Sequence, residues 1–236
     1  MAILDELLQP MTNREFRAEY LFRKPFAAAD RAAQFRKLIS WPLLADIFAT
    51  GYGDCWLPKA GRLPKEPERA TGRLALDQAM RAFGDGRSIL VRHSERAHGR
   101  LKEIAEDFQR VFSDPIDIQL YATPAGEEGF DWHYDIEEVF VIQSSGEKEF
   151  RLRIPRTPPS LEKVELPKTI DFGREFLPGE IRCHLKAGDW LYIPAGVWHK
   201  ARALTPSFHL SVGVMSSERR ALVKAESEQR RLQPSL

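Results

Sequence analysis

Cysteine is scarce in this sequence of 236 residues, where only Cys55 and Cys183 occur. Two isolated cysteines are too few for a disulfide framework or for a metal site built from thiolates. We therefore expect both side chains to be reduced thiols, as is usual in the cytosol.

Long apolar runs and an excess of charge are also absent. No run approaches the roughly 18 apolar residues of a membrane-spanning helix, and the first residues lack the basic and apolar regions of a secretory leader. The formal net charge is only +1, with basic and acidic residues interspersed. These features argue against a membrane partner and against nucleic acid as the main partner, and they favour a cytoplasmic location.

The order of patterns predicts a mainly β fold with flanking helices, in a single domain covering residues 1–236. Residues 1–87 carry apolar side chains at helical spacing and form the helical N-terminal part, interrupted at 51–72 by a stretch rich in Gly, Pro and Lys. Residues 88–216 form the β core, and residues 217–236 a charged C-terminal tail or surface helix. A loop as long as 51–72 often binds or covers something.

The run from Val139 to Ile142 is apolar at both parities, so both faces of this strand are expected to be covered. Further strands are predicted at 116–122, 148–154, 181–185, 190–193 and 208–214. A sheet covered on both sides fits a double-walled barrel with helices packed outside.

Two motifs predict one mononuclear iron site. His133 and Asp135 are two positions apart, so on an extended strand both side chains face the same side. Residues 188–199 have the form Gly-x5-Pro-x-Gly-x2-His and end at His199, after a turn that directs the chain back along the sheet. Two imidazoles and one carboxylate on one face of the metal are typical of non-haem Fe(II) oxygenases.

The chain resembles the JmjC oxygenases, and within them the cupin-like branch that includes the ribosomal oxygenases. The resemblance covers roughly residues 88–214 and depends on the segments 121–126, 133–135, 139–143 and 146–148. It implies a double-stranded β-helix (a jelly roll of the cupin type), Fe(II), and 2-oxoglutarate as cosubstrate. It also implies that Lys148 pairs with the far carboxylate of 2-oxoglutarate, with help from Tyr121 and Ser211.

Other residues receive weaker assignments. Gln119 stands where many members of the family carry an asparagine near the iron, and Trp132 is a candidate wall of the substrate pocket. Glu138 is near the glutamate of the general cupin motif but ranks below Asp135 as a ligand. The remaining histidines lack partners at ligand spacing and are expected at the surface or in packing; they are His93, His98, His184 and His209.

The resemblance favours an oxygenase that hydroxylates a protein side chain, with succinate as coproduct. The chain ends about twenty residues after its last predicted strand, without the C-terminal domains of the ribosomal oxygenases, so a small-metabolite substrate is the second hypothesis. The third is a cupin that binds metal without turnover, in a sensing or structural role. The sequence leaves the oligomeric state open.

Overall fold

Strand β5 (Glu138–Ser145) is buried on both faces and organises the fold. Its Phe140 and Ile142 belong to a core shared with the helices, whereas Val139 and Val141 belong to a second core that includes Phe150. The prediction that both faces of this strand are covered is therefore confirmed.

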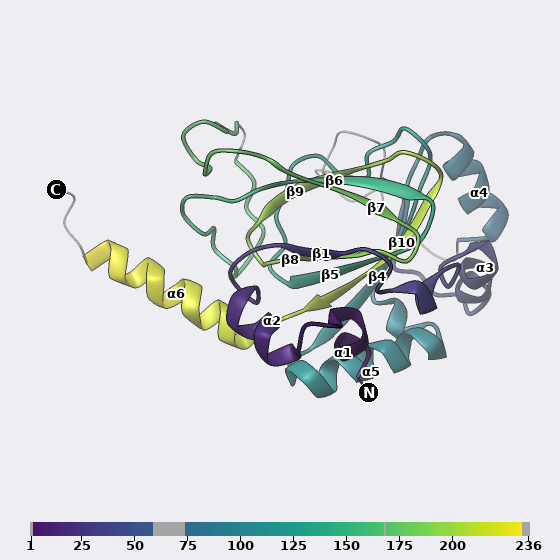
Figure 1. Cartoon of the computed structure of the whole chain (residues 1–236). Coiled ribbons are helices and arrows are strands. Elements are labelled where there is room, and N and C mark those ends of the chain that lie inside the picture. Colours follow the sequence, from purple (N-terminus) through teal and green to yellow (C-terminus); the bar gives the residue numbers. More distant parts are fainter. Residues whose placement is uncertain (1, 59–73, 168, 233–236) are drawn as a thin grey trace.

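The computed structural model describes residues 2–58, 74–167 and 169–232, and its strands form two facing antiparallel sheets (Figure 1). The larger sheet has the order β1-β8-β5-β10-β4-β3-β2 and the smaller one β7-β6-β9. The other strands are β1 (Phe26–Ala28), β2 (Cys55–Trp56), β3 (Ile89–Val91), β4 (Ile116–Thr123), β6 (Glu147–Arg153), β7 (Ile181–Lys186), β8 (Trp190–Ile193), β9 (Trp198–Ala203) and β10 (Ser207–Val214). This architecture confirms the predicted jelly roll.

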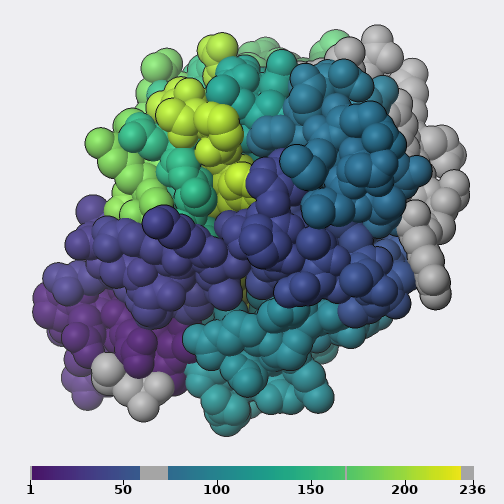
Figure 2. Space-filling model, turned by 90° about the vertical axis from the view of Figure 1, so that its right-hand side faces the viewer, coloured from purple at the N-terminus to yellow at the C-terminus, as the bar shows by residue number. Residues whose placement is uncertain are grey.

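Helices cover the outer face of the larger sheet. In Figure 1, α1, α2 and α5 lie beneath it, and Figure 2 shows the N-terminal segments and α5 packed side by side on the neighbouring face. Helix α5 buries Leu101, Ile104 and Phe108 along one stripe. The helices are α1 (Ile3–Leu8), α2 (Asn13–Glu19), α3 (Trp41–Ala49), α4 (Leu76–Gly84), α5 (Gly99–Phe112) and α6 (Ser217–Leu232), with 3-10 turns at Ala33–Phe35 and Ser94–Arg96.

The N-terminal part also contributes two short strands that were not predicted. Strand β1 pairs with β8, and β2 pairs with β3, so residues before 87 extend both edges of the larger sheet. Strands of three and two residues are too short to show an alternating pattern, which is why periodicity does not find them. Most of the 51–72 loop lies outside the described residues.

The C-terminal helix α6 packs against the back of the turn that precedes β9. Its Val223 is buried with Leu161 and Ala195, so the tail is a surface helix with one docked apolar position. Among the described residues, no helix combines the length and apolar character needed to cross a bilayer.

Candidate metal centre

The segment that carries His133 and Asp135 is pinned to strand β9 by backbone hydrogen bonds. His133 and His199 form an isolated β-bridge in which each residue donates its N–H to the other's carbonyl, at 3.1 and 2.7 Å. The N–H of Gly196 donates to the carbonyl of Asp135 at 2.9 Å. The structure thus replaces the expected strand with a single bridge, and this bridge is enough to bring the two motifs together.

A tight turn sets the position of His199. The N–H of Val197 donates to the carbonyl of Pro194, and Gly196 between them has a φ of +83°. A positive φ at this position is characteristic of a type II turn and favours glycine. A Cβ on Gly196 would also meet Pro159 at 3.0 Å, so the Pro-x-Gly element of the motif has a structural cause.

The three predicted ligands converge. The candidate ligand atoms of His133, Asp135 and His199 all lie within 4.8 Å of one another, and Nε2 of His199 is 3.4 Å from Oδ2 of Asp135. Tyr134, between the first two, points away and packs against Trp198. Alternation about His133 therefore works as the sequence predicts.

Both imidazoles are oriented by their second nitrogen. Nδ1 of His133 lies 2.7 Å from the carbonyl oxygen of Asp131, and Nδ1 of His199 lies 3.1 Å from that of Val197. A carbonyl oxygen only accepts, so each Nδ1 carries the proton and each Nε2 presents a lone pair. Burial, with His133 close by, lowers the pKa of His199 to about 4, which keeps this imidazole neutral near pH 7.

The three residues line one end of a cavity that extends between the two sheets toward Lys148. Lys148, on β6, is 2% exposed, and its Nζ donates to Oγ1 of Thr123 at 3.0 Å. The amino group also lies 5.7 Å from the centroid of the Tyr121 ring. Burial lowers the pKa of Lys148 to about 7, because the low-dielectric surroundings disfavour its charge.

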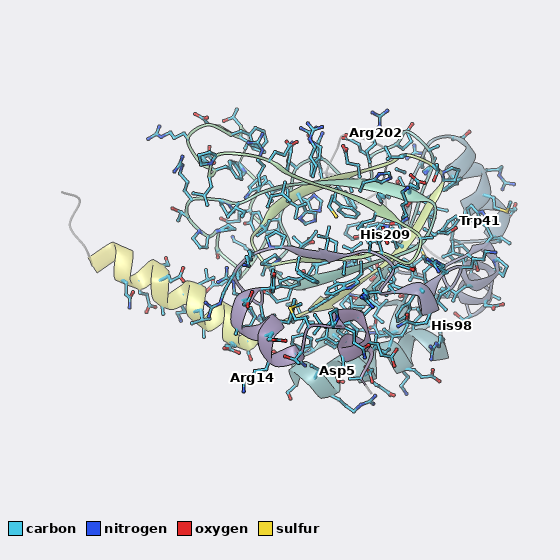
Figure 3. All side chains as sticks on the ribbon, in the orientation of Figure 1. Asp5, Arg14, Trp41, His98, Arg202 and His209 are labelled. Carbon is cyan, nitrogen blue, oxygen red and sulfur yellow. The ribbon has the colours of Figure 1, made fainter. Side chains whose placement is uncertain are left out.

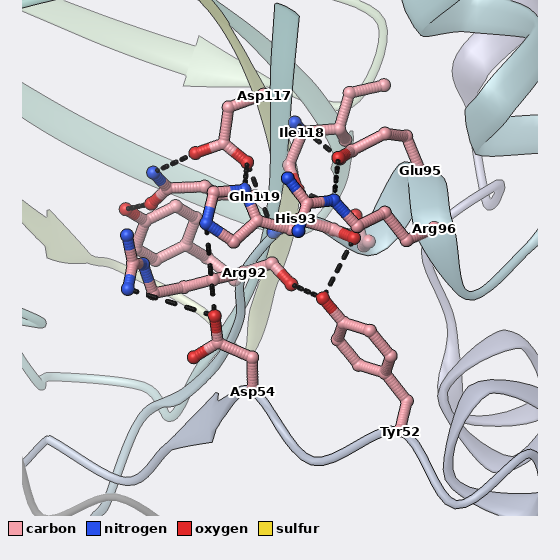
Figure 4. A network of polar contacts seen from close by, with 11 residues as sticks. Tyr52, Asp54, Arg92, His93, Glu95, Arg96, Asp117, Ile118 and Gln119 are labelled. Atoms are coloured by element: carbon pink, nitrogen blue, oxygen red, sulfur yellow. Dashed lines mark hydrogen bonds and ion pairs between the residues drawn. The ribbon is translucent and has the colours of Figure 1, made fainter.

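A chain of hydrogen bonds leads outward from this cavity along β4 (Figure 4). The hydroxyl of Tyr121 donates to Oε1 of Gln119 at 2.8 Å, and Nε2 of Gln119 donates to Oδ2 of Asp117 at 2.9 Å. Asp117 also accepts from the backbone N–H of His93, and Nδ1 of that ring lies 2.8 Å from Oδ1. The carboxylate therefore sets the orientation of the Gln119 amide and, through it, that of the Tyr121 hydroxyl.

A second group of potential ligands, His93, Glu95 and Asp117, belongs to this network. Its oxygens already have protein partners: the N–H of Ile118 donates to Glu95, and Asp117 accepts from His93 and Gln119. Because these carboxylates already accept hydrogen bonds from protein groups, we interpret the three residues as a structural network and not as a metal site.

The other predicted residues divide into two groups. Gln119, Tyr121 and Ser211 line the cavity. Trp132 instead packs against Phe172, outside the set of residues that line it. The reason is alternation, because His133 faces inward and its neighbour in sequence faces the opposite way.

Glu138 interacts with Tyr192 and with none of the three candidate ligands among the described hydrogen bonds. Its carboxyl is fully buried and accepts a hydrogen bond from the hydroxyl of Tyr192, on the helix side of the larger sheet. Burial raises the pKa of Glu138 to about 7. Ranking this residue below Asp135 therefore agrees with the geometry.

Three residues around the site were missed by sequence reasoning: Thr123, Glu137 and His209. Thr123 is the hydrogen-bond partner of Lys148, and the other two line the cavity. Burial, with Asp135 and Asp117 nearby, raises the pKa of Glu137 to about 7. Thr123 and His209 each stand two positions from a predicted residue on a strand, so period-two alternation was the signal that could have found them, whereas Glu137 follows Asp135 through a bend that carries no such signal.

Comparisons with known proteins point to one family. The JmjC domain model matches residues 91–222. The protein "Bifunctional lysine-specific demethylase and histidyl-hydroxylase NO66" of Drosophila mojavensis is 27% identical over 92% of this chain and 25% of its own length. Ribosomal oxygenase 2 of Bos taurus is 28% identical over 91% of this chain and 48% of its own length. The chain thus spans between a quarter and about half of these relatives.

Solved structures share the fold. The ribosomal oxygenase YcfD of Escherichia coli, in a complex with cobalt and 2-oxoglutarate, has a TM-score of 0.64 at 20% identity, over 96% of this chain and 58% of that one. A complex of the same protein with cobalt and succinic acid has a TM-score of 0.63. Since the family model covers more than half of the sequence, this chain belongs to the JmjC domain family.

Proposed function

We propose that this protein is an Fe(II)- and 2-oxoglutarate-dependent oxygenase that hydroxylates a protein side chain. One observation carries the proposal: the cavity that holds the converging His133, Asp135 and His199 also holds the buried amino group of Lys148. A metal position and a buried cation lining one cavity suit an anionic cosubstrate that reaches both.

The donor set fits ferrous iron. Two imidazole nitrogens with free lone pairs and one carboxylate form the facial arrangement typical of non-haem Fe(II) oxygenases. The carbonyls of Asp131 and Val197 hold the two rings in the ligating tautomer before any metal arrives. His133, Asp135 and His199 would hold the iron, which supplies the redox chemistry of dioxygen.

The far end of the cavity fits a carboxylate. Lys148 has a hydroxyl, from Thr123, as its hydrogen-bond partner among the described residues, and a buried ammonium group favours a charged acceptor. Tyr121 and Ser211 add polar groups to the lining. We assign Lys148 as the anchor of the far carboxylate of 2-oxoglutarate, with Ser211 and Tyr121 as further contacts. The Tyr121 hydroxyl, which donates to Gln119 here, would turn its single proton to the carboxylate when the cosubstrate binds.

In the proposed reaction, 2-oxoglutarate supplies the two electrons that the reduction of dioxygen requires beyond those from the substrate. A substrate C–H bond, dioxygen and 2-oxoglutarate give a C–OH group, succinate and carbon dioxide, with one oxygen atom in the hydroxyl and the other in succinate. The residues of this chain orient the reactants and limit the access of water to the cavity. The apolar side chains of Val139, Val141 and Phe150 contribute to this effect.

The relatives' names support a protein substrate, since they describe ribosomal oxygenases and histidyl-hydroxylases. We also propose that residues 1–236 act as one catalytic domain in the cytoplasm. Hydroxylation of a small metabolite, and metal binding without turnover, are alternatives that the experiment below separates from the main proposal.

The experiment supplies Fe(II) anaerobically, admits air, and measures succinate formed from 2-oxoglutarate. We expect formation that requires iron, with Lys148→Met as the control that keeps the metal ligands and loses the anchor. Absence of succinate under all conditions would identify a non-catalytic metal protein. Ribosomal proteins added to the reaction should gain the mass of one oxygen atom by mass spectrometry. Succinate formation stimulated only by small metabolites would assign the substrate to that class instead.

A further inference from the structure

His209 lies inside the molecule, beside the cavity. Figure 3 shows it between the two sheets, whereas Arg202 of β9 points outward from the smaller sheet. The side chain is 3% exposed and lines the cavity. Its ring stacks on Tyr121, with centroids 4.5 Å apart and planes inclined by 4°. The stacking thus fixes the plane of the imidazole.

This buried imidazole has unused hydrogen-bonding capacity. Its Nδ1 is inaccessible to solvent and has no hydrogen-bond partner among the described residues. The other ring nitrogen, Nε2, has no protein partner among the described hydrogen bonds and is not among the atoms closed off from solvent, so it is the nitrogen available to a ligand in the cavity that His209 lines. Burial, and then the nearby Lys148, hold the pKa of His209 well below its usual range. The ring is neutral near pH 7 and carries one N–H donor and one acceptor.

Lys148, at the same end of the cavity, also has hydrogen-bond donors without a protein acceptor among the described residues. Its amino group donates to the hydroxyl of Thr123, and within the described ranges no carboxylate forms an ion pair with it. An ammonium group has three donors, so further acceptors can be accommodated. Two buried donor-bearing groups on opposite sheets, β6 and β10, therefore face a space that an anion would fill.

We propose that His209 binds the cosubstrate, by donating a hydrogen bond to the carboxylate of 2-oxoglutarate that Lys148 holds. This inference rests on the proposed function and assigns a residue that neither motif contains. A neutral imidazole can donate without changing its charge state, so the contact adds to the ion pair of Lys148 without a second buried cation. A hydrogen bond to a charged partner is stronger than one between neutral groups.

The competing explanation is that His209 only fills space by stacking on Tyr121. His209→Phe separates the two roles, because phenylalanine preserves the flat ring and the stacking but has no donor. His209→Gln has the opposite character, since it loses the ring and restores an N–H donor. His184→Phe is the matched control, because His184 is exposed on β7 and pairs with Glu147, away from the cavity lining.

The test is isothermal titration of 2-oxoglutarate into protein saturated with Mn(II), which replaces iron without turnover. We expect His209→Phe to raise the Kd about tenfold, the loss of one hydrogen bond to a charged group. His209→Gln should stay within about threefold of the original protein, and His184→Phe should have no effect. The affinity for Mn(II) itself should be the same in all variants.

A second ligand sharpens the result. Titration of 2-oxopentanoate, which has the keto acid end but no far carboxylate, should give equal affinities for the original protein and His209→Phe. An unchanged Kd for 2-oxoglutarate in His209→Phe, or equal losses in His209→Phe and His209→Gln, would overturn the assignment of His209. Failure of the original protein to bind 2-oxoglutarate at all would instead overturn the proposed function.

Discussion

The two ends of the cavity are built in different ways. The metal end depends on one β-bridge and one turn, and its His133 and Asp135 are partly exposed. The end around Lys148 and His209 lies on regular strands of opposite sheets, and both side chains are almost fully buried. Sequence-local motifs build the first end, whereas the second exists only because two sheets face each other. Mutations at one end should therefore change metal affinity, and mutations at the other should change 2-oxoglutarate affinity.

The largest expected effect is at the metal end. His199→Ala removes one of three ligands and should weaken Mn(II) binding by more than about 100-fold, since even residues that only orient metal ligands affect affinity by 10- to 100-fold. The backbone bridge to His133 does not involve the removed side chain, so the fold should remain. Titration with Mn(II), alongside circular dichroism, measures both. Full metal affinity in this variant would contradict the assignment of the triad.

The affinity for 2-oxoglutarate should depend on pH because of Lys148. Burial lowers the pKa of Lys148 to about 7 without a bound anion, and a carboxylate partner would raise that pKa. The complex then binds more protons than the free protein above pH 7, so affinity for 2-oxoglutarate falls as the pH rises. Between pH 7 and pH 8 the Kd should increase about fivefold, by proton linkage.

Titration calorimetry with saturating Mn(II), in two buffers of different ionisation enthalpy, measures both this change and the proton uptake. Lys148→Arg is the control, because a guanidinium remains charged across this range and should remove the pH dependence. A flat profile for the original protein would show that Lys148 does not hold the anion. Metal affinity serves as the internal reference for the other end of the cavity.

The smallest effect on binding is expected outside both ends, in the network around Asp117. Asp117→Asn replaces an acceptor that serves His93 and Gln119, and should lower the free energy of unfolding by about 1–2 kcal/mol. The number of Mn(II) ions bound per chain should not change, because the network is structural. Thermal unfolding and metal titration test these points. Loss of one bound ion in Asp117→Asn would reveal a second metal site at His93, Glu95 and Asp117.

The sequence predicted the metal end well because each of its parts is local. His133 and Asp135 are two positions apart, and the turn at Gly196 needs a residue that tolerates positive φ. Trp132 packs on Phe172 outside the lining of this cavity, as alternation about His133 directs it. Sequence reasoning placed His209 in general packing, because nothing beside it in the sequence marks it as functional.

The missed residues share one property. Thr123 follows Tyr121 by two positions, Glu137 follows Asp135 by two, and His209 precedes Ser211 by two. On strands β4 and β10 this spacing places side chains on the same side, so Tyr121 and Ser211 indicated Thr123 and His209. Glu137 follows a bend, where the strand rule does not apply. Which of them actually reach the cavity depends on how the two sheets are paired.

The sequence by itself determined the β core, the identity of the three candidate ligands and the turn that presents His199, since alternation and turn chemistry act over a few residues. Only the tertiary structure decided that Lys148 and His209, on strands of opposite sheets, face the same buried space. It also decided that β1 and β2 of the N-terminal part complete the larger sheet. The physical reason is that strand pairing and sheet packing bring together residues far apart in the chain, and short-range sequence patterns do not show which of these residues come into contact.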